Sequence, residues 1–172
     1  MEINNNRNRL ILEAFKECIL TKSEALVLLE KSESSFRYDK LKTQKDIDEL
    51  SEWMTIIFKD KNTMSNKVTK NTMRKIYYDN DFIGYIGFNK YTIKKKKYLG
   101  IGNFMVIPKL QRKGYGSKII KDIIQNKSSI YDEIYCWVDE NNKNAIKFYK
   151  KIAEVSSNTN KDGFYYVTLY KK

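Results

Sequence analysis

The chain has 172 residues, enough for one domain or slightly more, and carries a formal net charge of +12 from 33 Lys and Arg against 21 Asp and Glu. It contains no histidine, one proline and two cysteines. The missing histidine excludes a Ser-His-Asp triad, a Cys-His pair and an HExxH zinc site. Cys18 and Cys136 lie too far apart in the sequence for a zinc knuckle, so we expect no metal site.

With 41% hydrophobic and 13% aromatic residues, the chain can build a packed core. No apolar run is long enough for a membrane span, and the polar first residues do not resemble an export signal. We therefore expect a cytoplasmic protein with no membrane contact, and two free thiols fit a reducing compartment. For the oligomeric state, monomer and homodimer both stay open.

The positive charge is concentrated after residue 60, whereas the first sixty residues are close to neutral. An anionic partner, such as a phosphorylated cofactor or a nucleic acid, is one explanation. Compositional bias is the other, because only five of the 33 cations are arginine and the chain is also rich in Asn, Ile and Tyr. For the lysine run 94–97 we favour the second explanation and expect the solvated tip of a hairpin.

Apolar residues recur at steps of three and four over residues 10–31, which predicts two short helices that break near Thr21 or Ser23. A helix-turn-helix is the weaker interpretation, because a third helix and a basic recognition face are missing. We expect residues 1–35 to be a helical extension that packs on the main domain.

The main domain is predicted over residues 36–172. A short strand from Phe36 to Leu41 leads to the segment Thr43 to Asp46, which is typical of a helix N-terminus. Residues 59–71 are expected to be a loop or a weak second helix. Strands follow at 73–78, 82–92 and 98–106, then a helix at 116–125, a strand at 134–138, a helix at 142–152 and a strand at 164–170. This order predicts a mixed α/β fold with antiparallel hairpins first and a strand–helix–strand crossover later.

The segment Phe104 to Gly116, FMVIPKLQRKGYG, places a strand before a basic, glycine-containing loop that opens a helix. Helix N-termini present N–H groups without acceptors and so bind anions. Gly114 and Gly116 let a phosphate approach the backbone, and Arg112 and Lys113 add positive charge. The pattern predicts a phosphate or pyrophosphate cradle, with a tight turn that merely needs glycine as the alternative. It matches neither the Walker nor the Rossmann spacing.

Two segments resemble one family. Gln111 to Gly116 resembles the Q/R-x-x-G-x-G/A motif of the GNAT superfamily, the Gcn5-related N-acetyltransferases. Val138 followed by Asn142, Ala145 and Tyr149 resembles the V…N-x-x-A-x-x-x-Y segment of the same family. The resemblance implies a central, mostly antiparallel sheet of six or seven strands, which is splayed between its fourth and fifth strands and flanked by about four helices.

The resemblance also implies acetyl-CoA as the cofactor. Its pantetheine would lie along the end of the fourth strand as an extra strand, with the N–H near Val106 donating to the thioester oxygen. Its pyrophosphate would lie on the loop amides, Asn142 would bind the pantetheine and Tyr149 would lie near the sulfur. The implied cofactor-binding residues are Phe104, Met105, Val106, Gln111, Arg112, Lys113, Gly114, Tyr115, Gly116, Ser117, Asn142 and Tyr149.

The implied reaction is direct acetyl transfer to an amine in a ternary complex. The amine must lose a proton to react, and Tyr149 would act as the acid that protonates the departing thiolate. Histone-type members place a glutamate near the position of Gly100, where this chain has no acid. Glu140 is the best remaining carboxylate for a base, with Asp139 next, although we favour deprotonation through water. Cys136 alternates with apolar residues, so we expect a core position rather than a nucleophile.

Three functions stay open at this point. The leading one is N-acetylation of a primary amine on an unidentified acceptor, selected mainly by residues 53–71 and 156–163 as in the family. The strong positive charge argues against polycationic acceptors such as polyamines. The second is acetylation of an aminoacyl-tRNA, as in toxin-type members, although a tRNA partner is not favoured. The third is a non-catalytic protein that senses acetyl-CoA or binds nucleic acid.

Overall fold

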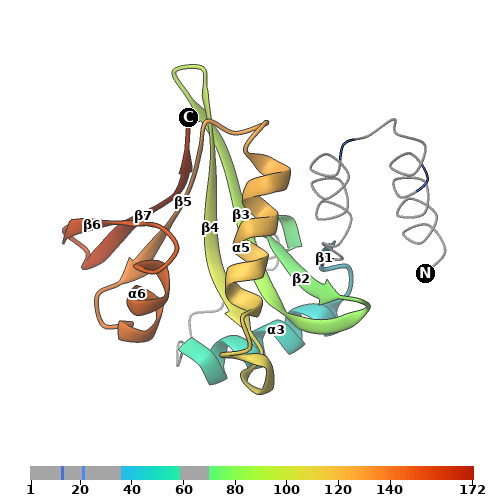
Figure 1. Ribbon diagram of the computed structural model, residues 1–172. Helices are drawn as coiled ribbons and strands as arrows, with labels where there is room; N and C mark the ends of the chain where they lie inside the picture. Colours follow the sequence, from blue (N-terminus) through green and yellow to red (C-terminus); the bar gives the residue numbers. More distant parts are fainter. Residues whose placement is uncertain (1–12, 14–20, 22–35, 59–69) are drawn as a thin grey trace. The chain divides into compact units, whose positions relative to one another are not determined.

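The computed structural model describes Glu13, Thr21, residues 36–58 and residues 70–172 (Figure 1). Residues 37–172 form one compact unit. The predicted N-terminal helices, their packing on the main domain and most of the predicted loop after residue 58 lie outside the described residues. In the part that is described, no helix is both long and apolar enough to cross a membrane.

Seven strands form one sheet in the order β1-β2-β3-β4-β5-β7-β6. Antiparallel pairs join β2 to β3, β3 to β4, β5 to β7 and β7 to β6, whereas β4 and β5 run parallel. The predicted fold class is therefore confirmed. The strands are β1 (Phe36–Lys40), β2 (Met73–Tyr78), β3 (Asp81–Ile93), β4 (Lys96–Val106), β5 (Glu133–Asp139), β6 (Glu154–Thr159) and β7 (Phe164–Lys171).

Helices cover both faces of the sheet. The first, α3 (Gln44–Phe58), packs Ile47 and Leu50 into a buried cluster with Met73, Tyr85 and Met105. On the other face lies α5 (Tyr115–Lys127), which buries its isoleucines and stands in front of β3 and β4 in Figure 1. A 3-10 turn, η1 (Pro108–Leu110), joins β4 to α5, and α6 (Lys143–Tyr149) follows β5.

Most predicted elements lie within a few residues of the observed ones, with two differences. The helix predicted over 142–152 ends at Tyr149, and the chain then turns into β6, a strand that the pattern did not predict. The lysine hairpin is confirmed, with its turn at Lys94 and Lys95 and its other two lysines inside β4. Asp79 and Asn80 both adopt positive φ, as the predicted turn between β2 and β3 requires.

The start of α3 is held by the predicted capping pattern. The N–H of Asp46 donates to Thr43 Oγ1 at 3.1 Å, and Asp46 Oδ2 accepts from the N–H groups of Lys42 and Thr43 at 2.8 and 2.9 Å. Lys75 Nζ of β2 lies 2.8 Å from Asp46 Oδ1. The hydrogen bond from Lys75, followed by the backbone donors, lowers the pKa of Asp46 well below its usual range.

The lowered pKa of Asp46 predicts that the unfolding free energy falls in acid. Because the folded-state pKa of Asp46 is lowered, its contribution is complete above the unfolded pKa of about 3.9 and is lost as the pH falls below that value. In an Asp46→Asn variant the unfolding free energy should therefore decrease less in acid than it does in wild type. Urea unfolding at a series of pH values measures this difference. Asp48→Asn, on the exposed side of α3, is the matched control. An equal loss of unfolding free energy in acid for wild type and Asp46→Asn would contradict the prediction.

Candidate active site

A slot opens between β4 and β5 where the two parallel strands stop pairing. Their last paired residues are Ile101 and Cys136. Beyond this apex β4 continues beside β3 as far as Val106, and β5 continues beside β7 as far as Asp139. Each strand therefore follows its own antiparallel neighbour, and Figure 1 shows β4 and β5 diverging toward α6. The splay predicted between the fourth and fifth strands is present.

A β-bulge in β4 accompanies the splay. Tyr85 pairs with Met105 and Gly87 pairs with Gly102, so Ile86 alone opposes two residues of β4. One of the two, Asn103, has a φ of 45°. A bulge bends its strand and increases the local twist, which turns the end of β4 away from β5. The bend also brings β3 close, since a Cβ on Gly84 would overlap the carbonyl oxygen of Met105.

The backbone of Val106 faces the slot. The N–H of Ile107 donates to the carbonyl of Ile83 at 2.9 Å, and Val106 is the cross-strand partner of Gly84. Bonded and non-bonded pairs alternate in an antiparallel ladder, so the N–H and C=O of Val106 turn away from β3. Gln111 Nε2 donates to this carbonyl at 2.9 Å, which leaves the Val106 N–H directed at the slot. Phe104 is one of the two bulged residues of β4, so the alternation does not extend to its backbone.

The basic loop forms an open N-terminus for α5. Gly114 is the N-cap residue with a φ of 85°, and no side chain in the described part of the chain caps the helix. The first intrahelical bond runs from the N–H of Lys118 to the carbonyl of Gly114 at 3.2 Å. The N–H groups of the three preceding residues, 115–117, thus have no acceptor within the helix. Among the described residues, apart from Gly114 and its two chain neighbours, no heavy atom lies within 4 Å of the place where a Cβ on Gly114 would stand, and the side chains of Arg112 and Lys113 are exposed beside it.

Gly116 links this loop to α6. A Cβ at Gly116 would stand 3.3 Å from two ring atoms of Phe148 and 4.0 Å from the ring of Phe104. Tyr115 packs edge-on against Tyr78 with 5.7 Å between ring centroids. The start of α5, the end of β4 and α6 therefore meet at one place, next to the slot.

Tyr149 reaches the apex of the slot from α6. Its side chain is buried, and its hydroxyl neighbours the thiol of Cys136, the last residue of β5 that pairs with β4. Burial, followed by the neighbouring Cys136, raises the pKa of Tyr149 well above its ordinary value. The phenol therefore stays protonated, as a hydrogen-bond donor requires. The contact was not predicted, because the two residues come from separate elements.

Cys136 is a core residue, as expected. Its side chain is 2% exposed, and burial raises the pKa of its thiol to about 12, although the hydrogen bond from Tyr149 acts in the opposite direction. Its thiolate is therefore negligible at neutral pH. In a Cys18→Ser variant, where Cys136 is the only thiol, alkylation by iodoacetamide should be at least about a thousandfold slower in the folded than in the urea-unfolded protein. Mass spectrometry measures both rates, and similar rates would contradict the assignment.

Comparison with known proteins identifies the family. Residues 30–153 match the model of the Acetyltransferase (GNAT) family. The chain belongs to this family. No curated protein sequence matches the chain.

Solved structures share the GNAT fold with this chain. Arabidopsis thaliana Naa50, in complex with the bisubstrate analogue CoA-Ac-MVNAL, is 21% identical, with a TM-score of 0.58 over 78% of this chain and 97% of that one. Campylobacter jejuni N-acetyltransferase PseH, in complex with acetyl coenzyme A, is 19% identical, with a TM-score of 0.56 over 80% and 99%. Arabidopsis thaliana NAA60, in complex with acetyl-CoA, is 15% identical, with a TM-score of 0.58 over 78% and 96%. At these identities the likeness shows the fold.

Two predicted site residues of this GNAT chain lie beyond the end of β5. Asn142 is the N-cap of α6, and its Oδ1 accepts from the N–H of Ala145 at 3.1 Å, so its carboxamide also holds the helix. Glu140 is exposed, and its N–H donates to the carbonyl of Gly163 at 2.9 Å. A Cβ on Gly163 would stand 3.3 Å from Glu140 Oε1, so this carboxylate lies against the turn between β6 and β7.

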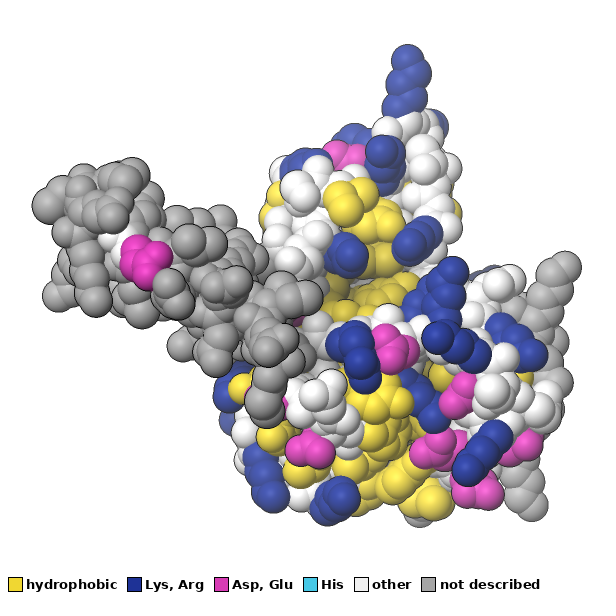
Figure 2. All heavy atoms as spheres, turned by 90° about the vertical axis from the view of Figure 1, so that its right-hand side faces the viewer, with side chains coloured by type: hydrophobic (Ala, Val, Ile, Leu, Met, Phe, Trp, Pro, Cys, Tyr) yellow, Lys and Arg dark blue, Asp and Glu magenta, His cyan; other side chains and the backbone are white. Residues whose placement is uncertain are grey.

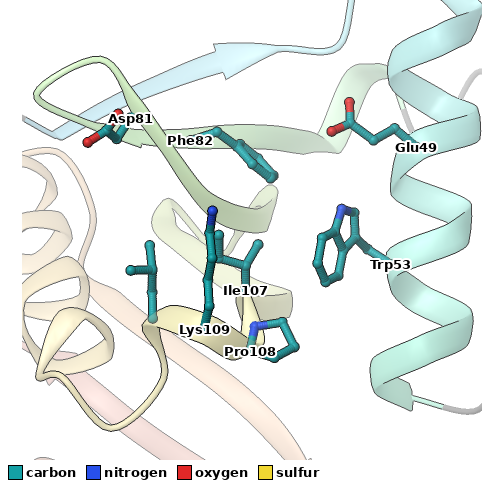
Figure 3. A pocket seen from close by; sticks show the side chains of 8 residues that line it. Glu49, Trp53, Asp81, Phe82, Ile107, Pro108 and Lys109 are labelled. Atoms are coloured by element: carbon teal, nitrogen blue, oxygen red, sulfur yellow. The ribbon is translucent and has the colours of Figure 1, made fainter.

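A cavity lies on the α3 side of the sheet. Its volume is about 670 Å³, and Figure 3 shows Trp53 facing Phe82 and Pro108 across it. No lining residue belongs to β5 or α6, whereas the lining residues Ile107 to Leu110 continue directly from the Val106 edge of the slot. Of its residues, only Trp53 fell within the segments predicted to select the acceptor. The cavity is lined by Glu49, Trp53, Asp81, Phe82, Ile107, Pro108, Lys109 and Leu110.

Proposed function

We propose that this GNAT protein is an acetyl-CoA-dependent N-acetyltransferase that transfers the acetyl group directly to a primary amine. The observation that carries the proposal is the slot, which has the Val106 N–H on one edge, the uncapped N-terminus of α5 at one end and the Tyr149 hydroxyl at its apex. Family membership supports the same activity. Acetyl coenzyme A in the PseH structure and the bisubstrate analogue in Naa50 support the cofactor.

The loop before α5 fits a pyrophosphate. Gly114 leaves open space in front of the free N–H groups of the first helical turn, and Arg112 and Lys113 flank this space. The positive end of the helix dipole and the two cations all favour a negative charge here. Gln111 keeps the loop against the end of β4 through its bond to the Val106 carbonyl. Residues 111–117 would therefore hold the phosphates while the edge of β4 at Val106 pairs with the pantetheine amides.

The bound cofactor would supply the acetyl thioester. In the proposed reaction the amine nitrogen bonds to the acetyl carbon, the carbon–sulfur bond breaks and the sulfur leaves with the bonding electrons. The N–H of Val106 would stabilise the charge that develops on the carbonyl oxygen. The protonated Tyr149 phenol would donate its proton to the departing sulfur, and water, which takes up the proton of the amine, would return one to the phenolate.

The proton that the amine loses would pass to water. Within the described residues the β4 edge of the slot carries no carboxylate, and Asp139 and Glu140 are exposed at the end of β5. Glu140 stays the best carboxylate candidate for a base, but its contact with the β6–β7 turn favours a role in shaping that turn. We therefore propose deprotonation through water and no dedicated base.

Thermal melting with and without acetyl-CoA tests the cofactor site. A ligand at one hundred times its Kd stabilises the folded state by about 2.7 kcal/mol, which is a rise in Tm of roughly 5–10 °C for a chain of this length. Release of free CoA thiol only when an amine is present would then show transfer rather than mere binding. No shift at millimolar acetyl-CoA would overturn the proposed cofactor, and a shift without turnover on any amine would favour a sensor.

A further inference from the structure

Five aromatic side chains form a continuous strip on the sheet face that α3 only partly covers. This aromatic strip is Tyr91, Tyr98, Tyr135, Trp137 and Tyr166. The five residues share one face, because Tyr91 is the cross-strand partner of Tyr98, Trp137 is that of Tyr166, and Tyr135 is two residues from Trp137. Neighbouring ring centroids lie 4.8 to 6.2 Å apart, with Tyr91 stacked on Tyr98 and Tyr135 stacked on Tyr166.

The rings of the strip are held in place yet accessible. The Tyr91 hydroxyl donates to the Tyr135 hydroxyl, and the Tyr166 hydroxyl donates to Glu133 Oε1, both at 2.7 Å. Residue 100 is glycine, and a Cβ there would stand 3.0 Å from the Tyr135 hydroxyl oxygen, so it would press on the ring that lies across β4. Trp137 is 48% exposed and Tyr91 is 38% exposed, so both ends of the strip offer ring surface to a ligand.

A lysine cluster lies at one end of the strip. Lys96, Lys171 and Lys172 surround a hollow of about 150 Å³ together with Tyr98, Asp132 and Glu133. Lys96 is on the same face as Tyr98, two residues along β4, and Lys171 is the cross-strand partner of Glu133. Figure 1 places the C-terminus beside the β3–β4 hairpin, and basic side chains gather near the same height in Figure 2. Three lysines face two carboxylates around this hollow, with Lys172 Nζ 3.6 Å from Asp132 Oδ1, and Lys94 and Lys95 add positive charge at the turn of the same hairpin.

The other end of the strip adjoins the slot. Trp137 directly follows Cys136, the last residue of β5 that pairs with β4. From Glu133 to Trp137 the strand rises about 13 Å, a length over which more than one planar ring can stack. Tyr135, in the middle of the strip, is only 9% exposed, so a ligand on this face would meet ring surface mainly at Tyr91 and Trp137, between positive charge at one end and the slot at the other.

We propose that the aromatic strip and the lysine cluster bind a single-stranded nucleic acid segment, with bases on the rings and phosphates near the lysines. Single strands are bound without strict sequence preference by this combination of stacking rings and positive charge. The net charge of +12 favours the same polyanion, and a polycationic amine would be repelled by the lysine cluster. The strip would then present an acceptor amine carried on the nucleic acid to the slot; that last step alone rests on the proposed acetyltransferase function.

Fluorescence of Trp137 tests the binding directly. In a Trp53→Phe variant Trp137 is the only tryptophan, and titration with an oligouridylate of about eight nucleotides should quench its emission through stacking. Affinity should fall as salt increases. Uridine monophosphate, added at the same nucleotide concentration, should quench far less. Equal quenching by the mononucleotide would overturn the proposal in favour of a free-nucleotide site, and no quenching by either would overturn it outright.

The fluorescence anisotropy of a labelled oligouridylate shows which residues contribute to binding. Trp137→Ala should weaken binding about tenfold. The logarithm of the binding constant falls linearly with the logarithm of the salt concentration, and the double variant Lys96→Gln with Lys171→Gln should reduce the magnitude of this slope by about two. The charge-matched control, Lys45→Gln with Lys121→Gln on α3 and α5, should leave the slope unchanged. Equal effects of the two lysine pairs would overturn the assigned face. The acetyl-CoA thermal shift of each variant should equal that of wild type, so failure of RNA binding and failure of the acetyltransferase proposal are told apart.

Discussion

Gly114→Glu should weaken acetyl-CoA binding by about two to three orders of magnitude. The new carboxylate would stand in the open space before the N-terminus of α5, where the proposed pyrophosphate lies. Two like charges about 4 Å apart at a protein surface repel with about 4 kcal/mol, and each 1.4 kcal/mol is about tenfold in Kd. The carboxylate would also accept from the free N–H groups of the first turn and so occupy the donors that the phosphates need.

Gly114→Gln is the matched control for this prediction. Any side chain at residue 114 is strained, because the backbone has a φ of 85° there, so both variants should lose similar unfolding free energy, about 1–2 kcal/mol. Only the glutamate adds charge, and Gln should therefore weaken acetyl-CoA binding much less, about tenfold. Calorimetric titration measures both Kd values. Equal losses would mean that loop shape rather than charge decides binding, and wild-type affinity in both would remove the loop from the cofactor site.

The sequence predicts well those parts of the fold that depend on residues close together in the chain. Thr43 and Asp46 form a capping pattern that predicts the start of α3, and the hydrogen bonds between them are present. Asp79 and Asn80 tolerate the positive φ that their turn needs. The glycines at 114 and 116 likewise mark the start of α5, since one has positive φ and the other packs against Phe148.

The parts that sequence did not predict depend on contacts between distant elements. β6 is polar and lies at the edge of the sheet, and its pairing with β7 is irregular, so it lacks an alternating apolar pattern. The bulge in β4 has a positive φ at Asn103, where no glycine signals it. The contact between Tyr149 and Cys136 brings α6 and β5 together.

The aromatic strip was missed for the same reason. Its residues come from four strands, and among thirteen tyrosines no single one is conspicuous in the sequence. The alternation of Glu133, Tyr135 and Trp137 was the one local sign that these side chains share a face. The sheet order, in which β4 and β5 lie between β3 and β7, is what brings them together.

Tyr149→Phe should lower kcat by about a hundredfold or more and leave the Kd for acetyl-CoA within about twofold. The phenol lies at the apex of the slot and is buried, so Phe fills the same volume and only the hydroxyl is lost. Removal of a general acid costs about 10²–10⁴ in rate. Because burial raises the pKa of Tyr149 above its ordinary value of about 10, the wild-type rate should show no alkaline fall from this group below about pH 10.

Cys136→Ala separates the acid role from a structural one. This variant removes the sulfur next to the Tyr149 hydroxyl but leaves the hydroxyl itself, so kcat should stay within a few-fold of wild type. A structural role of the contact predicts instead that Tyr149→Phe and Cys136→Ala lower stability and kcat alike. Single-turnover transfer rates and thermal melts of both variants distinguish the two. Wild-type turnover by Tyr149→Phe would exclude Tyr149 as the acid and leave the sulfur to be protonated by water.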